Sequence, residues 1–217
     1  MTIEINTPIL QFNDRLAAEN RSLLSTNRVF MLDVLASPGA GKTSLILAAI
    51  EALRTTYRIA VIEGDVASDV DAQRVKQANI EAVQINTNGA CHLEAAMVAR
   101  ALEALDLTAL DLIIVENVGN LVCPTEFDIG SNCRIVVASV PEGDDKPLKY
   151  PAIFSIVEAV LVNKIDTLPV FDFDLRAFTD VIFGINPTAP VMALSAKTGE
   201  GLNVFTDWLV QRINQDV

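Results

Sequence analysis

The chain has 217 residues, of which 51% are hydrophobic, and its formal net charge at pH 7 is −12. This length and apolar content suffice for one compact domain with a sizeable core, whereas the negative charge disfavours nucleic acid or an anionic membrane surface as a partner. The 3 cysteines are too few for a disulfide framework in a chain of this size. We find neither a leader segment nor an apolar run long enough to span a bilayer, so we expect a cytoplasmic protein.

Helices and strands alternate along the sequence. In chain order, the hydrophobic pattern predicts a helix at about 7–26, a strand at 29–35, a helix at 43–53, strands at 58–63 and 82–85, a helix at 93–105, strands at 111–116, 134–140, 159–163 and 191–194, and a closing helix at 201–214. The strands are apolar on both faces, which is typical of a parallel sheet with helices on both sides. No repeat, low-complexity tract or linker divides the sequence. We therefore predict a single α/β domain over residues 1–217, doubly wound with mostly parallel strands.

The first predicted strand leads into a phosphate-binding loop. Residues 36–43 match the P-loop pattern except at Ala36, where the pattern has glycine. Small residues let consecutive backbone N–H groups curl around phosphate oxygens, Lys42 would reach the β- and γ-phosphates, and the Thr43 hydroxyl would ligate Mg²⁺. An ordinary glycine-rich turn is the alternative, but the Gly-Lys-Thr ending between a strand and a helix favours a P-loop NTPase. The expected phosphate-site residues are Ser37, Pro38, Gly39, Ala40, Gly41, Lys42, Thr43 and Ser44.

Two further segments indicate guanine as the base. Asn163-Lys164-Ile165-Asp166 follows an apolar predicted strand, and Ser195-Ala196-Lys197 follows the next strand. The Asp166 carboxylate can accept hydrogen bonds from both N1–H and the exocyclic amine of guanine, a pair that adenine lacks. The Asn163 amide can meet N7, and the Lys164 stem can lie across the base. This order after a P-loop resembles the guanine-recognition signature of GTPases, so we expect GTP and GDP. The expected base-site residues are Asn163, Lys164, Asp166, Ser195, Ala196 and Lys197.

Acidic residues at two predicted strand ends are candidates for Mg²⁺ and the γ-phosphate. Glu116 and Gly119 occupy the place where GTPases commonly carry Asp-x-x-Gly, so the carboxylate can hold Mg²⁺ through water and the glycine N–H can meet the γ-phosphate. Asp65 and Asp71 follow the second strand, where a switch loop could reach Mg²⁺ or the attacking water. The alternatives are a polar strand end at Glu116 and plain solvated acids at Asp65 and Asp71. The expected hydrolysis residues are Lys42, Thr43, Asp65, Asp71, Glu116 and Gly119, of which Thr43, Asp65, Asp71 and Glu116 would lie near Mg²⁺.

A possible metal site combines two cysteines with the single histidine of the chain. Cys91-His92 stands at a predicted helix start, and Cys123 lies just beyond Gly119. Soft thiolates with an imidazole suit Zn²⁺ or Ni²⁺. The spacing matches no zinc finger or ribbon, and buried cysteines most often behave as small hydrophobic residues. From spacing alone, both interpretations stay open.

The sequence segments that carry a family resemblance are NDRLAAENR (13–21), SPGAGKT (37–43), EGD (63–65), QINT (84–87), CHLEA (91–95), ENVGNLVCP (116–124) and DKPLKYP (145–151). Together they resemble the HypB family, the GTPases that assist nickel insertion during maturation of [NiFe] hydrogenase, over about residues 12–209. The resemblance implies a GTP-dependent homodimer with a metal site at the subunit interface. It also implies a nickel-delivery companion protein and the hydrogenase large subunit as target. Matched motif to motif, Cys91, His92 and Cys123 fall on the metal-binding positions of the family, whereas Cys133 has no counterpart and is expected to be structural.

The sequence also departs from that family. It has neither the histidine-rich stretch nor the Cys-x-x-Cys-Gly-Cys motif that many members carry near the N-terminus, so we expect no nickel storage. The predicted helix after His92 offers Ala96 and Arg100 where some relatives add histidines. This leaves few ligands per chain, favours a site built by two chains, and leaves Zn²⁺ or Ni²⁺ open.

Three other functions are weighed against this one. A urease-maturation GTPase would carry a Cys-Pro-His motif, whereas Thr125 follows Cys123-Pro124 here. A nucleotide switch or scaffold would need no metal, and its cysteines would be structural. A kinase would need a second substrate pocket, which no motif suggests. We expect slow GTP hydrolysis, with a hydrolytic base that the sequence does not identify.

Overall fold

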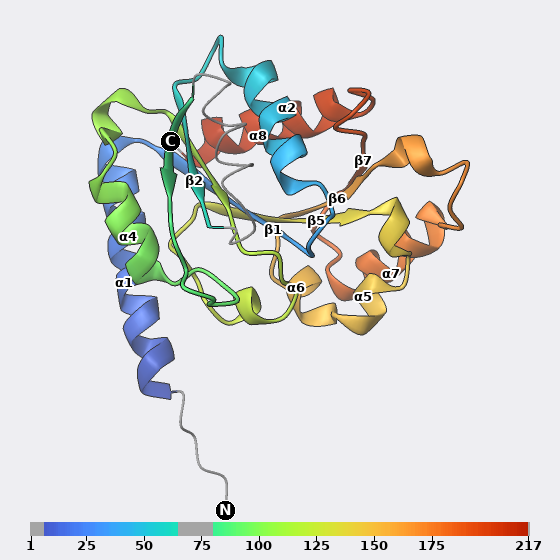
Figure 1. Ribbon diagram of the computed structural model, residues 1–217, viewed down its shortest axis with the longest axis horizontal. Helices are drawn as coiled ribbons and strands as arrows, with labels where there is room; N and C mark the ends of the chain where they lie inside the picture. The colour runs from blue at the N-terminus through green and yellow to red at the C-terminus, as the bar shows by residue number, and fades with distance from the viewer. Residues whose placement is uncertain (1–6, 65–79, 217) are drawn as a thin grey trace, which may run out of the picture.

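The computed structural model describes residues 7–64 and 80–216 and contains one sheet with the strand order β3-β2-β4-β1-β5-β6-β7 (Figure 1). All its neighbouring strands pair in parallel. The strands are β1 (Phe30–Ala36), β2 (Ile59–Glu63), β3 (Glu81–Gln84), β4 (Leu112–Glu116), β5 (Cys133–Ser139), β6 (Ala159–Asn163) and β7 (Val191–Ala193). Because the strands are parallel, their carboxyl ends meet at one edge of the sheet, where ligands bind in this class of fold.

Helices cover both faces of the sheet. The α-helices of the described residues are α1 (Thr7–Asn27), α2 (Lys42–Leu53), α4 (Ala95–Glu103), α5 (Lys146–Lys149), α6 (Pro151–Ser155), α7 (Leu175–Ile185) and α8 (Leu202–Asp216). Short 3₁₀ turns occupy η1 (Leu107–Ala109), η2 (Cys123–Thr125), η3 (Val140–Glu142) and η4 (Ile165–Thr167). In Figure 1, α2 and α8 lie together on one side of the sheet, and α1 and α4 lie side by side on the other. No helix among these residues is both long and apolar enough to cross a bilayer.

The central strand β1 serves both layers. Phe30, Leu32 and Val34 pack with α2 and α8. The alternate residues point the other way, so that Met31 packs with α1 and α4 while Leu35 packs with α6 and α7. All positions of β1 are buried, which is why its sequence is an almost continuous apolar run rather than an alternating one.

The predicted α/β class with a doubly wound parallel sheet is confirmed, and each predicted strand or helix is present within two residues of its predicted ends. One longer helix was not predicted. Helix α7 has a clear amphipathic pattern, because Phe178 and Ile182 are buried, and Asp174 caps it by accepting a hydrogen bond from the N–H of Ala177. The signal for this helix was present in the sequence, and we assigned no element between residues 164 and 190.

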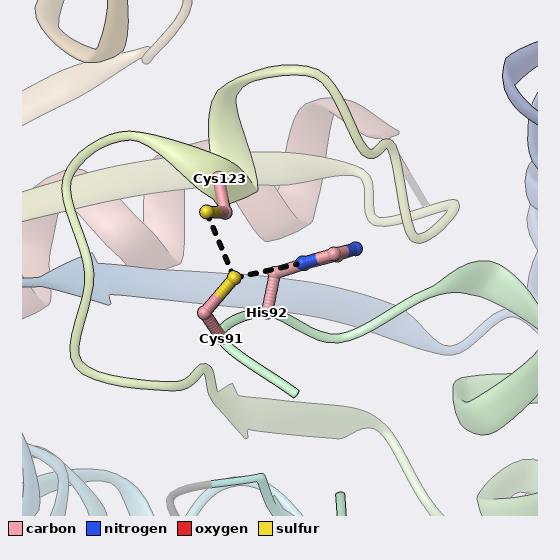
Figure 2. A group of neighbouring side chains, drawn as sticks. All are labelled: Cys91, His92 and Cys123. Carbon is pink, nitrogen blue, oxygen red and sulfur yellow. Dashed lines mark hydrogen bonds between the residues drawn. The ribbon is translucent and has the colours of Figure 1, made fainter. Parts of the chain in front are cut away.

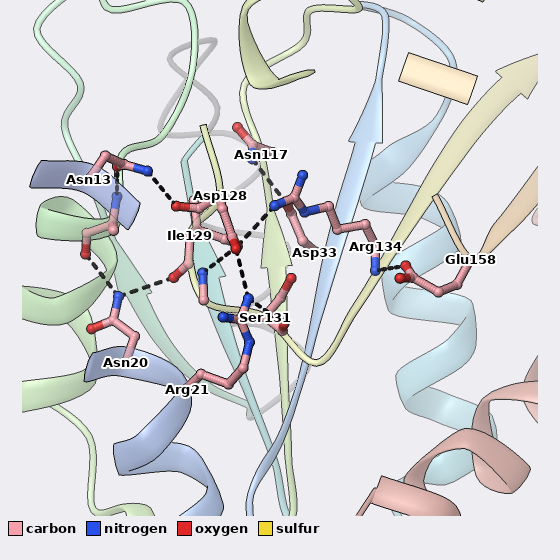
Figure 3. A network of polar contacts seen from close by, with 12 residues as sticks. Asn13, Asn20, Arg21, Asp33, Asn117, Asp128, Ile129, Ser131, Arg134 and Glu158 are labelled. Carbon is pink, nitrogen blue, oxygen red and sulfur yellow. Dashed lines mark hydrogen bonds and ion pairs between the residues drawn. The ribbon is translucent and has the colours of Figure 1, made fainter. Parts of the chain in front are cut away.

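Two buried asparagines fasten α1 to the rest of the molecule (Figure 3). The Asn13 amide donates to the carbonyl of Asp128 (2.7 Å) and accepts from the N–H of Ala95 (2.9 Å). The Asn20 amide donates to the carbonyls of Ala95 (2.9 Å) and Ile129 (3.0 Å). Each amide therefore contacts both the first residue of α4 and the loop that precedes β5.

A buried carboxylate lies in the middle of β1. Asp33 is 1% exposed, and its Oδ1 accepts a hydrogen bond from Nδ2 of Asn117 (3.0 Å). Burial raises the pKa of Asp33 to about 6, because the loss of hydration outweighs the opposing effects of the Asn117 hydrogen bond and the positive charge of Arg134. The folded state therefore holds this proton more tightly than the unfolded state does.

We expect Asp33→Asn to remove one source of pH dependence from the stability. The pKa is about 6 in the folded state and 3.8 without the fold, so the wild-type free energy of unfolding falls as pH rises between these values. The asparagine keeps an oxygen facing Asn117 and carries no charge, so it should raise the free energy of unfolding near neutral pH by roughly 1–3 kcal/mol. Urea unfolding at several pH values between about 4 and 7 measures this. A variant with the wild-type pH profile would contradict the assignment.

Candidate functional site

The P-loop joins β1 to α2 at the carboxyl edge of the sheet. Its backbone is left-handed at two glycines, with φ of 82° at Gly39 and 94° at Gly41, a conformation that costs glycine little. A Cβ at Gly41 would lie 2.6 Å from Nδ2 of Asn163, so this position also lacks space for a side chain. Lys42 and Thr43 then begin α2, and the Lys42 side chain is buried. Ser44 follows on the exposed side of the helix.

Hydrogen bonds tie the P-loop to the segment after β6. Nδ2 of Asn163 donates to the carbonyl of Ala40 (3.0 Å), and Nζ of Lys164 donates to the carbonyl of Gly39 (2.6 Å). Oδ1 of Asn163 also accepts from the N–H of Ala196 (3.1 Å), beyond β7. One buried amide thus joins the loops after β1, β6 and β7, and the predicted phosphate and base residues form one continuous site.

The remaining predicted base residues lie next to this amide. Oγ of Ser195 donates to Oδ1 of Asp166 (2.7 Å), which fixes the direction of the carboxylate. Ser195 is buried, whereas Lys197 is exposed at the rim of the same loop. The carboxylate that we expect to recognise guanine is therefore already oriented by a neighbouring hydroxyl.

The hydroxyl and the carboxylate predicted to lie near Mg²⁺ are adjacent. Oγ1 of Thr43 donates to Oε1 of Glu116 (2.8 Å), which brings together the start of α2 and the end of β4. On the other side of the loop, the hydroxyl of Ser37 donates to the carboxylate of Glu142, whose second oxygen accepts from Ser139 (2.7 Å). We did not predict a role for Glu142. Asp65 and Asp71 lie outside the described residues.

Gly119 brings the segment after β4 against the P-loop. A Cβ built on Gly119 would lie 3.1 Å from the backbone nitrogen of Pro38 and 3.2 Å from its Cα. Such distances are below normal van der Waals contact, so the two backbones approach as closely as they do because residue 119 has no side chain. The predicted place of Gly119 beside the phosphate loop is consistent with this contact.

Cys91, His92 and Cys123 converge in space although 32 positions separate the two cysteines (Figure 2). Their ligand atoms all lie within 4.8 Å of one another. Sγ of Cys91 donates to Sγ of Cys123 (2.8 Å) and lies 3.6 Å from Nδ1 of His92. This is the cluster of soft donors that the sequence could only suggest.

The surroundings of the cluster favour a metal ligand set. The His92 ring packs on Phe127 with centroids 3.9 Å apart, and its Nε2 lies 3.7 Å from Oε1 of Glu94. Burial lowers the pKa of His92 despite the opposing effect of Glu94, so the neutral imidazole that binds metals predominates at neutral pH. A nearby carboxylate is a common outer partner of a ligating histidine.

The donor set fits one thiophilic ion with a small rearrangement. Two thiolates on a tetrahedral ion, each with a bond of about 2.3 Å, lie about 3.8 Å apart. The two sulfur atoms are 2.8 Å apart, so they would separate by about 1 Å. The hydrogen bond to Cys123 raises the pKa of Cys91, and an ion would replace that shared proton. Cys133 is buried in β5, where burial raises the pKa of its thiol, in agreement with the structural role that we predicted.

Two asparagines hold the cysteine cluster, and we did not predict them. Nδ2 of Asn120 donates to the carbonyl of Cys91 (3.1 Å). Oδ1 of Asn117 accepts from the N–H of Leu93 (3.2 Å) while its Nδ2 reaches Asp33. Both residues lie in the ENVGNLVCP segment (116–124). The only signal in the sequence for their role was the presence of polar residues between a predicted strand and the Cys-Pro pair.

Comparisons with known proteins identify relatives of this chain. A family model described as "CobW/HypB/UreG, nucleotide-binding domain" matches residues 31–193. The hydrogenase maturation factor HypB of Azotobacter vinelandii is 45% identical over 95% of this chain and 68% of its own length. The probable HypB of Methanocaldococcus jannaschii is 40% identical over 98% of this chain and 96% of its own length. A crystal structure of HypB from Helicobacter pylori in complex with nickel superimposes with a TM-score of 0.89 at 36% identity, covering 94% of this chain and 96% of that one.

We expect Asn163→Ala to destabilise the fold by about 2–4 kcal/mol, because it leaves the buried carbonyl of Ala40 and the N–H groups that Oδ1 accepts without partners. Chemical denaturation measures this loss. Asn203→Ala is the matched control, since Asn203 is exposed on α8, and it should change stability by less than about 0.5 kcal/mol. Equal effects of the two substitutions would contradict the structural role of Asn163.

Proposed function

The chain belongs to the HypB hydrogenase maturation factors of the CobW/HypB/UreG nucleotide-binding family, and on that premise we propose that it hydrolyses GTP and passes Ni²⁺ toward the large subunit of a [NiFe] hydrogenase. The observation that carries the proposal is the position of the cysteine cluster. Cys123 lies on the same segment as Gly119, which contacts the P-loop. A nucleotide-dependent movement of that segment would change the distance between the metal donors.

The nucleotide would sit on the P-loop with its phosphates at residues 37–44. Lys42 would balance charge on the β- and γ-phosphates, and Mg²⁺ would neutralise the charge that develops during phosphoryl transfer. Thr43 and Glu116 support this proposal by their adjacency. From the sequence, Asp65 and Asp71 complete the Mg²⁺ set. Positioning without a strong general base suits a slow GTPase that acts as a switch.

Guanine would be selected by the residues after β6 and β7. The Asp166 carboxylate accepts from Ser195, and its remaining lone pairs would accept from N1–H and the exocyclic amine of the base. Asn163 would meet the base, while Ala196 and Lys197 would border it. Lys164 would lie along the ring with its charge directed to the Gly39 carbonyl.

The metal cargo, Ni²⁺ or Zn²⁺, would be held by Cys91, His92 and Cys123. Three donors from one chain leave a tetrahedral or square-planar ion one ligand short. Cys91 is exposed, and Val122 beside Cys123 is 59% exposed, so the cluster lies at the surface, where a second chain could complete it. We therefore propose a GTP-dependent homodimer with the metal at its interface, which exchanges the ion with a nickel-delivery companion protein.

The main competing function is a nucleotide switch without metal delivery, in which the cysteines serve only packing. If the protein were such a switch, the wild type would bind metal no more tightly than a variant without the cysteines. The exposure of Cys91 argues against a packing role, because a thiol kept for packing is normally buried.

Asp166→Asn should change the base preference from guanine to xanthine. An amide NH₂ cannot accept the guanine amine but can donate to the xanthine carbonyl, so we expect GTP affinity to fall at least about tenfold and xanthosine triphosphate affinity to rise. Titration calorimetry with both nucleotides measures this. Asp172→Asn, an exposed acid on the following loop, removes the same charge and should leave both affinities unchanged. Undiminished GTP binding in Asp166→Asn would exclude the proposed base site.

Cys91→Ala and Cys123→Ala should each weaken Ni²⁺ binding to reduced, tag-free protein at least about tenfold, because loss of even an outer partner of a metal ligand can cost that much. Titrations with GDP and with a non-hydrolysable GTP analogue, with mass in solution followed in parallel, measure binding and dimerisation together. The control is Cys133→Ala, which removes a buried thiol of β5 and should bind like the wild type. If the three variants and the wild type bind Ni²⁺ equally, metal delivery is wrong and the nucleotide-switch function stands.

A further inference from the structure

One side chain contacts both halves of the cysteine cluster. The carboxamide of Asn120 donates through Nδ2 to the carbonyl of Cys91 (3.1 Å) and accepts through Oδ1 from the N–H of Val122 (2.8 Å), the neighbour of Cys123. The two cysteines come from separate segments of the chain. Asn120 therefore fixes the distance between the backbones that carry them.

The same residue is next to the contact with the P-loop. A Cβ built on Gly119 would lie 3.1 Å from the backbone nitrogen of Pro38. Strand β4 ends at Glu116, which accepts a hydrogen bond from Thr43. Residues 117–120 are therefore the part of this segment that a change of the P-loop, or of the Glu116 partner of Thr43, would reach first. From there, the hydrogen bond from Asn120 connects the segment to Cys91.

Two further supports of the cluster come from α1, and their hydrogen bonds lie away from the P-loop. Asn13 and Asn20 of α1 hold Ala95 and the loop at Asp128 and Ile129 (Figure 3). These amides keep the outer ends of both cluster segments at a constant separation. The inner ends instead depend on the segment that follows β4, where Asn120 holds Cys91 and Val122 and Asn117 holds Leu93.

We propose that Asn120 is a positioning residue that couples the nucleotide state to metal affinity, by moving the Cys91 backbone relative to Cys123. The inference rests on the proposed function, since it needs a metal at the cluster and a nucleotide on the P-loop. The separation of the sulfur atoms, 2.8 Å in the structure, must increase by about 1 Å for two thiolates to share a tetrahedral ion. A hydrogen bond that shifts one cysteine backbone by a fraction of this distance is sufficient to change affinity.

The decisive quantity is the ratio of the Ni²⁺ dissociation constants with GDP and with a non-hydrolysable GTP analogue. Asn120→Asp keeps the oxygen that accepts from Val122 and replaces the donor to Cys91 with a second oxygen. We expect the ratio to move at least about fivefold toward one, while nucleotide affinity stays at the wild-type value. A purely structural role would weaken binding equally in both states and leave the ratio unchanged.

The control is Asn88→Asp. Asn88 lies three positions before Cys91 on the exposed loop, has a φ of 52° that aspartate tolerates, and uses its side chain for no hydrogen bond among the described residues. The substitution adds the same charge on the loop that leads to Cys91 and leaves both hydrogen bonds of Asn120 in place, so it should preserve the wild-type ratio. Asn120→Ala, which removes both hydrogen bonds without adding charge, serves as the second variant and should also bring the ratio toward one.

Two outcomes would overturn the inference, and they are distinguishable. A wild-type ratio retained in Asn120→Asp and Asn120→Ala, in proteins that bind Ni²⁺ and both nucleotides, removes Asn120 from the coupling and leaves the proposed function intact. A wild-type protein that binds no Ni²⁺, or binds it equally with either nucleotide, overturns metal delivery gated by GTP and this inference with it.

Discussion

The close approach of Gly119 to Pro38 is the constraint on which both candidate sites depend. Because Gly119, three residues beyond the end of β4, has no side chain, the backbone of this segment lies directly against the phosphate loop. Parallel pairing of β1 with β4 sets the direction of both segments, so the contact follows from the sheet. Cys123, four residues further along the chain, is thereby placed on the segment that contacts the P-loop.

Amide side chains perform most of the positioning around this contact. Asn163 joins three loops at the carboxyl edge of the sheet, and Asn117 links the buried Asp33 of β1 to Leu93. An asparagine can donate and accept at once, so one residue satisfies two backbone groups without bringing a charge into a buried place. The loops of the nucleotide site are thereby held together by neutral groups.

Most of the fold could be predicted from the sequence because the strands are apolar runs that alternate with amphipathic helices. The P-loop and the segment at Asn163 could be identified because their spacing is local. The cysteine cluster could not be established in this way, since Cys91 and Cys123 meet only after β4 and α4 are placed. Asn120 and Glu142 were missed for the same reason, because their partners are distant in sequence and a lone polar residue in a loop has no characteristic pattern. Helix α7 was missed although its pattern was local.

The separation of Cys91 and Cys123 along the chain has a consequence for the order of events during synthesis. Closing a loop of 32 residues between the two thiols is unfavourable in an unfolded chain. An ion that needs both thiols and His92 therefore has little affinity for nascent protein and binds after the sheet has formed. By mass action, such an ion would stabilise only the folded state. Release of the ion would lower the free energy of local unfolding at this edge of the sheet. A protease would then cleave the metal-free protein faster than the metal-bound protein.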